Sequence, residues 1–306
     1  MTHFGSDLKG ADLRAKVIAL VPAFHKLRDL GSSLIPKVEA ASARDRIIAY
    51  LQRYPKVVVD GDELMVVSGI AEWARRLREL RVQYGWAIYS GVTFHDIADE
   101  AQDAGSVPEL AELETVLGLH PSRIKPDQYV LMREEQDRNA AYRWNVLNEI
   151  RRSKHGVREK FIEYFRRNVG EQVTGEELRY LAGDTSAWPR RVRELRTEFG
   201  WPIVTRSSGR TDLPIGVYML ELDRQAHEHD RKIPDPVRVE VLRRDKYRCV
   251  ICGWSRSDLT PDDPRKMLEL HHVKHHAAKG ENTPENLITL CNVHHDEEHR
   301  SQKHRR

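Results

Sequence analysis

The chain lacks the features that mark secreted and membrane proteins. It has only three cysteines, an odd number that does not suit a disulfide framework. No run approaches the roughly eighteen apolar residues that a membrane-spanning helix requires, and the N-terminal residues have no apolar core of a signal peptide. We therefore expect a cytoplasmic protein with no membrane partner.

Net charge is also low, at +3 over 306 residues. Residues 1–236 carry 36 basic and 36 acidic side chains, so the whole excess lies in the last 70 residues. Any surface that binds nucleic acid must therefore be local. Hydrophobic residues make up 40% and charged residues 32%, which is typical of a globular protein, and the length suffices for two or three domains.

The N-terminal segment shows helical periodicity without chemical character. Residues 7–54 are expected to form helices broken at Gly31 and Pro36, and Leu13, Val17 and Leu20 keep helical spacing. We interpret residues 1–43 as a helical arm that serves packing or dimerisation.

An internal repeat follows. Residues 61–86 and 175–201 share a tryptophan at Trp73 and Trp188, then an Arg-Arg pair, the sequence Arg-Glu-Leu-Arg and a closing Gly-Trp. Each copy is expected to run helix, short extended segment, helix, turn, longer helix and strands. That order resembles a winged helix-turn-helix, although residues 88–128 stand where the first copy would have its wing.

The longer helix of each copy carries arginines away from its apolar face. A charged helix is usually a solvated surface, but the same four positions are basic in both copies, which favours contact with nucleic acid. Arginine suits this work because its planar guanidinium pairs with phosphate or with a guanine edge. The predicted DNA-binding residues are Arg75, Arg76, Arg78 and Arg81 in the first copy, and Arg190, Arg191, Arg193 and Arg196 in the second.

The C-terminal segment holds eight of the fifteen histidines in its last 36 residues. Cys249-x-x-Cys252 and Cys291-x-x-His294 provide four ligands in two pairs, and Cys3His is an ordinary structural zinc set. The sequence therefore predicts a structural Zn²⁺, which would stabilise a segment with few large apolar side chains. The alternative is three reduced, buried cysteines without metal.

Three separated blocks in this segment are similar to the HNH endonuclease family. They are Arg243-Arg-Asp-Lys-Tyr-Arg-Cys-Val-Ile-Cys-Gly253, Leu268-Glu-Leu-His-His-Val273 and Glu285-Asn-Leu-Ile-Thr-Leu-Cys-Asn-Val-His-His295. The resemblance covers residues 237–299 and implies a ββα-metal domain. The family's second Cys-x-x-Cys is Cys-x-x-His here, which keeps a zinc ligand.

The resemblance also implies catalytic roles. His272 would be the general base that activates water, and Asn286 would fix the loop between the strands and orient His272. His271 and His295, with His299 as a third ligand one helical turn later, would hold one divalent cation. That cation is expected to be Mg²⁺, with Mn²⁺ or Ni²⁺ as substitutes. From the residues alone, the order of ligand and base in the His-His pair stays open, because neighbouring strand residues point to opposite faces.

The predicted fold class is α+β and multidomain, with a mainly helical N-terminal part, two winged-helix-like repeats and a C-terminal HNH domain. The predicted domains are the arm 1–43, the first module 44–132, a connecting helix with the second module 133–222, a linker 223–236 and the nuclease domain 237–306.

The favoured function is a metal-dependent endonuclease that hydrolyses phosphodiester bonds in double-stranded DNA, most simply a sequence-specific restriction enzyme, and dependence on a modified base stays open. One such centre cuts one strand, so we expect a homodimer; no small-molecule substrate is indicated. The alternative is a winged-helix DNA-binding regulator with a zinc-stabilised but inactive tail.

Overall fold

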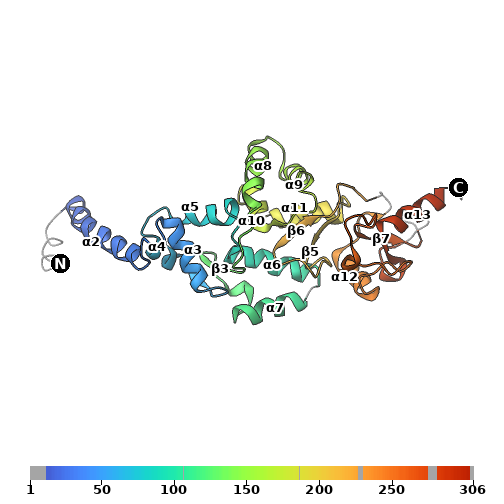
Figure 1. The fold of residues 1–306 in the computed structure, drawn as a ribbon, viewed down its shortest axis with the longest axis horizontal. Coiled ribbons are helices and arrows are strands. Elements are labelled where there is room, and N and C mark those ends of the chain that lie inside the picture. The colour runs from blue at the N-terminus through green and yellow to red at the C-terminus, as the bar shows by residue number, and fades with distance from the viewer. Residues whose placement is uncertain (1–11, 106, 186, 227–229, 275–280, 304–306) are drawn as a thin grey trace. The chain divides into compact units, whose positions relative to one another are not determined.

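The structure is a computed structural model that describes residues 12–105, 107–185, 187–226, 230–274 and 281–303. The chain forms two compact units. The first comprises residues 1–91 and 124–141, and the second comprises residues 92–123 and 142–306 (Figure 1). None of the described helices is long and apolar enough to cross a bilayer.

The first unit joins a helical arm to a small mixed domain. Its elements are α2 (Leu13–Ser33), α3 (Ala43–Arg53), β1 (Val59–Asp60), α4 (Gly61–Ser68), α5 (Trp73–Arg78), η1 (Glu79–Gln83), β2 (Ile88–Ser90) and β3 (Gln128–Leu131). The strands form an antiparallel sheet of order β1-β3-β2. Ile47, Leu64 and Leu77 lie in its core. A capping box between Asp60 and Glu63 starts α4.

The second unit contains the other copy of the module and two helices that come earlier in the chain. Its elements up to the second sheet are α6 (Gly91–Asp103), α7 (Val107–Leu117), η2 (Pro121–Arg123), α8 (Ala140–Arg152), α9 (Val157–Arg166), β4 (Val173–Thr174), α10 (Gly175–Leu181), α11 (Trp188–Thr197), β5 (Ile203–Thr205) and β6 (Val217–Leu220). The sheet again has the order β4-β6-β5.

The two sheets agree in register as well as in order. Val59 pairs with Tyr129 as Val173 pairs with Tyr218, and the Ile88–Leu131 pair corresponds to Ile203–Leu220. In each copy the tryptophan meets the β3 or β6 tyrosine edge to face, at centroid distances of 6.0 and 5.8 Å. The internal repeat predicted from the sequence is therefore confirmed. Its assignment to the winged-helix class stays a prediction.

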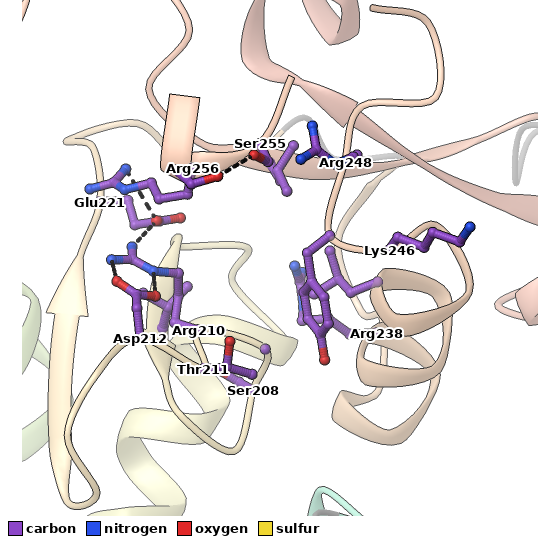
Figure 2. A pocket seen from close by; sticks show the side chains of 16 residues that line it. Ser208, Arg210, Thr211, Asp212, Glu221, Arg238, Lys246, Arg248, Ser255 and Arg256 are labelled. Carbon is purple, nitrogen blue, oxygen red and sulfur yellow. Dashed lines mark hydrogen bonds and ion pairs between the residues drawn. The ribbon is translucent and has the colours of Figure 1, made fainter. Parts of the chain in front are cut away.

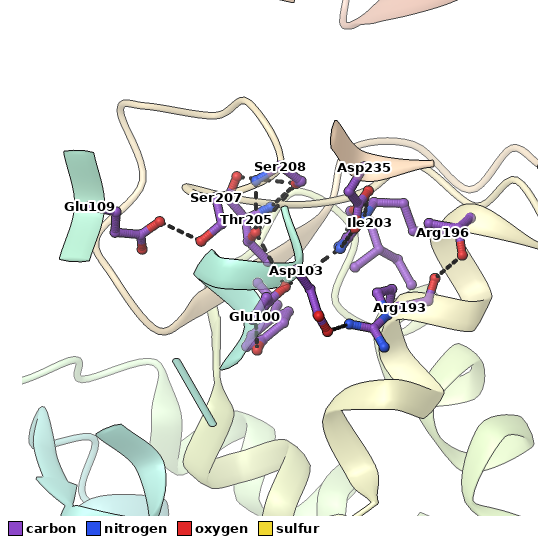
Figure 3. Close-up of polar contacts among 12 residues, drawn as sticks. Glu100, Asp103, Glu109, Arg193, Arg196, Ile203, Thr205, Ser207, Ser208 and Asp235 are labelled. Atoms are coloured by element: carbon purple, nitrogen blue, oxygen red, sulfur yellow. Dashed lines mark hydrogen bonds and ion pairs between the residues drawn. The ribbon is translucent and has the colours of Figure 1, made fainter. Parts of the chain in front are cut away.

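The insertion between β2 and β3 packs on the second copy of the module. Glu100 of α6 accepts a hydrogen bond of 2.5 Å from Tyr218, and Asp96 accepts one of 3.2 Å from Trp188. Glu109 of α7 bonds Ser207 in the β5–β6 loop (Figure 3). The predicted first module, 44–132, thus contains a stretch that belongs to the second compact unit.

The C-terminal domain is built on one hairpin and two helices. Its elements are α12 (Asp235–Arg244), η4 (Arg256–Asp258), β7 (Leu268–His272), η6 (Pro284–Asn286), β8 (Leu287–Cys291) and α13 (Asn292–Lys303). β7 pairs antiparallel with β8, from Leu268 opposite Cys291 to His272 opposite Leu287. Ile233, only 2% exposed, packs with Leu270 and Leu287. The last residues of the predicted linker, 223–236, are therefore part of this domain.

Four potential ligands meet at one end of the hairpin. The thiols of Cys249, Cys252 and Cys291 and a ring nitrogen of His294 lie within 4.8 Å of one another. Nδ1 of His294 is 3.5 Å from Sγ of Cys249 and 3.2 Å from Sγ of Cys291. Ligands that bind Zn²⁺ tetrahedrally at about 2.0 and 2.3 Å lie about 3.5 Å apart, so the quartet fits the ion. Burial raises the pKa of the Cys291 thiol to about 11, and zinc binding would release that proton.

We predict that Cys252→Ser removes tightly bound zinc and destabilises the C-terminal domain, because a tetrahedral site loses one thiolate. Cys252 is exposed, so the substitution itself costs little packing. Atomic emission after dialysis should find about one zinc per wild-type chain and clearly less in the variant, with a lower melting temperature. Val250→Ser, at a half-exposed neighbour, is the control. Equal zinc content in all three proteins would contradict the prediction.

Candidate active site

A second cluster lies at the other end of the hairpin. Strand β7 ends in His271 and His272, and α13 contributes His295 and His299, which are one helical turn apart. Asp230 joins them from the segment before α12. Of these five side chains only His299 has appreciable exposure; the other residues are at most 5% exposed.

The carboxylate of Asp230 is the meeting point of the cluster. Its Oδ2 lies 3.1 Å from Nε2 of His295 and 2.6 Å from Nε2 of His299. Its Oδ1 lies 3.0 Å from Nδ1 of His272. Ligand atoms of Asp230, His271, His295 and His299 all fall within 4.8 Å of one another. The rings of His271, His295 and His299 stand nearly perpendicular in pairs, with centroids 4.6–5.3 Å apart.

His272 is held at both ring nitrogens. Nδ1 faces Asp230, and Nε2 lies 2.7 Å from Oδ1 of Asn282. Burial acts to lower the pKa of His272, but the hydrogen bonds to Asp230 and Asn282 raise it above its usual value. Burial acts to raise the pKa of Asp230, and the bonds from three histidines hold it well below its usual value. The carboxylate is therefore ionised among the histidines.

Asn286 lies in the loop that joins the two strands. Its Oδ1 accepts from the backbone N–H of Lys274 at 2.8 Å, and its Nδ2 donates to the carbonyls of Lys274 and Glu281 at 2.9 Å. These bonds tie the two sides of the loop together. The amide side chain that contacts His272 is that of Asn282.

The adjacent residues His294 and His295 belong to different clusters. His294 lies with the cysteines, and the adjacent His295 lies with Asp230, as expected for helix residues that project about 100° apart. His272, the last residue of β7, contacts Asp230 at 3.0 Å, and a ligand atom of His271 lies within 4.8 Å of the same carboxylate. The structure thus brings the predicted ligand and base together without placing them on one strand face.

The donor set of the cluster suits a divalent cation. Imidazole binds first-row transition metals, and carboxylate oxygen is a ligand that Mg²⁺ and Mn²⁺ prefer. Two ligands at about 2.1 Å and 90° to each other lie about 3 Å apart, close to the separations at Asp230. Glu269 adds an outer contact, with Oε2 3.4 Å from Nδ1 of His295. Such contacts orient ligating histidines.

The predicted DNA-binding arginines differ in their surroundings. Arg75 and Arg76 form ion pairs with Glu79 at 3.3 and 2.9 Å, and Arg190 and Arg191 form the same pairs with Glu194 at 3.1 and 2.8 Å. Arg78 is exposed, and the guanidinium of Arg81 lies 5.9 Å from the ring centre of Tyr129. The repeat therefore preserves the ion pairs along with the arginines.

Arg193 and Arg196 are engaged inside the second unit. Arg193 pairs with Asp103 of α6. Arg196 is 3% exposed and makes two hydrogen bonds to Asp235, at 2.8 and 2.5 Å (Figure 3). The prediction that Arg196 contacts DNA is wrong, because its guanidinium is buried against the first residue of α12. The equivalence of sequence positions did not reveal that Asp235 of α12 and Glu100 of α6 contact this guanidinium.

A basic cavity of about 380 Å³ lies between the β5–β6 loop and the C-terminal domain (Figure 2). Arg210 in its wall is paired with Asp212 and Glu221. Its charged lining residues are Arg210, Arg238, Lys246, Arg248 and Arg256 with Asp212 and Glu221. Cations outnumber acids, so the cavity favours anions. The histidine cluster does not line it.

Three residues near the site were not predicted. The sequence could have indicated Glu269, because it lies two residues before His271 and strand periodicity puts both side chains on one face. No sequence pattern indicated Asp230 or Asn282. Their proximity to His272 depends on how the segment before α12 and the loop between β7 and β8 fold against the hairpin. His227, His229, His275 and His276 lie outside the described residues.

Two family models match the chain. The KpnI N-terminal domain matches residues 44–132 and 158–221, which together are half of the 306 residues and include both copies of the repeat. The HNH endonuclease model matches residues 249–301 and confirms the resemblance seen in the sequence. No curated protein and no solved structure matches. The chain therefore belongs to the KpnI N-terminal domain family of restriction enzymes, and its C-terminal HNH domain makes it a DNA endonuclease.

Proposed function

We propose that the chain is a metal-dependent restriction endonuclease in which His272 is the general base. The observation that carries the proposal is the convergence of His271, His295, His299 and Asp230 on one point beside His272. A catalytically inactive tail, the alternative, would not be expected to keep this buried and charge-balanced group, whose desolvation is costly.

In the proposed mechanism the residues of the hairpin and of α13 have different roles. His271, His295 and His299 would hold the cation, and Nε2 of His272, once released from Oδ1 of Asn282, would accept the proton of the attacking water while Nδ1 donates to Asp230. A bound divalent cation would neutralise the charge that builds on the scissile phosphate and the leaving oxygen. Mg²⁺ is the proposed ion, with Mn²⁺ or Ni²⁺ as substitutes. Asn286 would keep the loop closed, and Asn282 would hold the ring of His272 until the attacking water takes its place.

We predict that His272→Ala lowers the cleavage rate by about 10²- to 10⁴-fold while DNA binding is kept, because the variant loses general-base catalysis but no charge on the DNA-facing surface. Conversion of supercoiled plasmid in the presence of Mg²⁺ or Mn²⁺ measures the rate. His155→Ala changes an exposed histidine and should cut like wild type. Cleavage by His272→Ala at the wild-type rate would rule out His272 as the base.

For site selection we propose that α5 and α11 are the recognition helices of two winged-helix-like modules. Arg75, Arg190 and Arg191 have exposed side chains, so they can exchange their glutamate partners for phosphate or base edges. Trp188 is buried and hydrogen-bonded to Asp96, so it supports the core. We therefore favour recognition of an unmodified sequence over a tryptophan cage for a modified base.

Arg190→Ala and Arg191→Ala should each weaken DNA binding and reduce the slope of log K against log salt by about one, because each would remove one phosphate contact. Fluorescence anisotropy across a salt series provides the measurement. Arg167→Ala, a half-exposed ion-paired arginine on the α9 side, should leave the slope unchanged. If both variants keep the wild-type slope, the arginine face of α11 is exposed to solvent and does not contact DNA.

We propose further that the chain acts as a homodimer through α2. Leu13, Val17, Leu20, Phe24 and Leu27 are spaced four, three, four and three, the heptad pattern of a coiled coil. These side chains are 43–79% exposed, and Gly31 is the buried residue of α2. An exposed apolar stripe of this length suits a second copy of the same helix. Two copies would bring two single-strand cutting centres to one site.

Substituting Glu at both Leu20 and Phe24 should make the protein monomeric, since charges would face each other in the coiled coil. Sedimentation would show the lower mass, and plasmid digests would accumulate nicked circles in place of linear DNA. Ile18→Glu, on the far side of α2, is the matched control and should remain dimeric. A wild-type protein that sediments as a monomer and still linearises plasmid in one encounter contradicts this proposal.

A further inference from the structure

Asp230 lies outside every motif that identifies the nuclease. The matched segments end at residue 221 and resume at residue 249, so the carboxylate belongs to neither family pattern. It is nevertheless 5% exposed and contacts three of the four histidines at the catalytic end of the hairpin. A buried carboxylate in such surroundings requires a partner of positive charge.

The carboxylate of Asp230 lies where a ligand of the proposed cation would lie. Oδ2 lies 3.1 Å from Nε2 of His295 and 2.6 Å from Nε2 of His299, the nitrogens that α13 would present to the cation. The other oxygen, Oδ1, remains for His272. One oxygen can therefore bind a cation while the second contacts the base, as a monodentate carboxylate does in many metal sites.

The segment that carries Asp230 is anchored at three positions that follow it. Asn282 donates from Nδ2 to the carbonyl of Lys232 at 2.9 Å while its Oδ1 contacts His272. Ile233 packs in the core of the nuclease domain, and Asp235 is held by Arg196. These anchors put the carboxylate in place before any ligand binds, which lowers the entropic cost of binding.

We propose that Asp230 is the fourth protein ligand of the catalytic cation and that the segment 230–233 is part of the active centre. The inference rests on the proposed function, because it assumes that the histidine cluster holds the ion. Three neutral imidazoles form a site that suits Ni²⁺ and Zn²⁺. The added carboxylate brings an oxygen ligand and a negative charge, and both favour Mg²⁺ and Mn²⁺.

The test measures Mn²⁺ binding directly on the full-length, zinc-loaded protein without DNA. The electron paramagnetic resonance signal of free Mn²⁺ reports binding, and zinc already fills the thiolate site, which Mn²⁺ disfavours. Asp230→Asn keeps the shape and removes the charge, so it should weaken Mn²⁺ binding by at least about tenfold. Ni²⁺ should lose less affinity, since imidazole nitrogens dominate its binding.

Asp223→Asn is the matched control, because it makes the same change on an exposed side chain of the same segment. It should bind Mn²⁺ like wild type. Retained zinc content and an unchanged melting temperature of Asp230→Asn would show that the domain is folded; if that variant is unstable, Asp230→Glu serves instead and should shift the ratio of Mn²⁺ to Ni²⁺ affinity.

The outcomes separate this inference from the function on which it rests. Wild-type Mn²⁺ affinity in Asp230→Asn, or an unchanged Mn²⁺ to Ni²⁺ ratio in a folded Asp230→Glu, overturns the ligand role of Asp230 alone. Wild-type Mn²⁺ affinity in His271→Ala and His295→Ala would mean that the cluster holds no cation, and the proposed function would then fail together with this inference.

Discussion

The proposed nuclease centre depends on the contact between the Asp230 carboxylate and the histidines around it. One residue contacts the end of β7 through His272 and one face of α13 through His295 and His299. Glu269 also contacts His295 at this buried point, but burial raises its pKa, so Asp230 is the carboxylate that would balance the charge of a cation. The carboxylate is there because the segment before α12 folds against the hairpin, with Ile233 in the core.

A second buried charge pair fixes that segment from the other side. Arg196 of α11 holds Asp235 at the start of α12, and Glu100 of α6 lies 3.5 Å from the same guanidinium. Removing one partner of such a pair leaves a buried charge unpaired and typically lowers the stability of the fold by about 3–5 kcal/mol. The helix proposed to read DNA is therefore tied to the first helix of the nuclease domain. Its exposed arginines lie at its N-terminal half, and its last arginine is structural.

Sequence patterns revealed what depends on local spacing. The repeat, the quartet of Cys249, Cys252, Cys291 and His294, and the place of His299 one turn after His295 follow from residues at fixed separations. The hairpin and the pairing of His271 with His295 were implied by the resemblance to the HNH family. The patterns could not reveal Asp230, which reads as one polar residue in a polar stretch. They also suggested that Arg196 is equivalent to Arg81, because nothing in the helix shows that Glu100 of α6 and Asp235 of α12 contact Arg196. Both failures concern contacts between segments distant in sequence, where burial rather than residue type decides the role.

The central claim is that two interleaved metal centres share the helix α13, one for folding and one for catalysis. Anomalous diffraction from crystals of the zinc-loaded protein soaked in Mn²⁺ tests it most directly, with data on either side of each metal's absorption edge. We expect zinc density among Cys249, Cys252, Cys291 and His294, and manganese density within about 2.3 Å of Asp230, His271, His295 and His299. Manganese density elsewhere, or a single metal shared by both clusters, would contradict it.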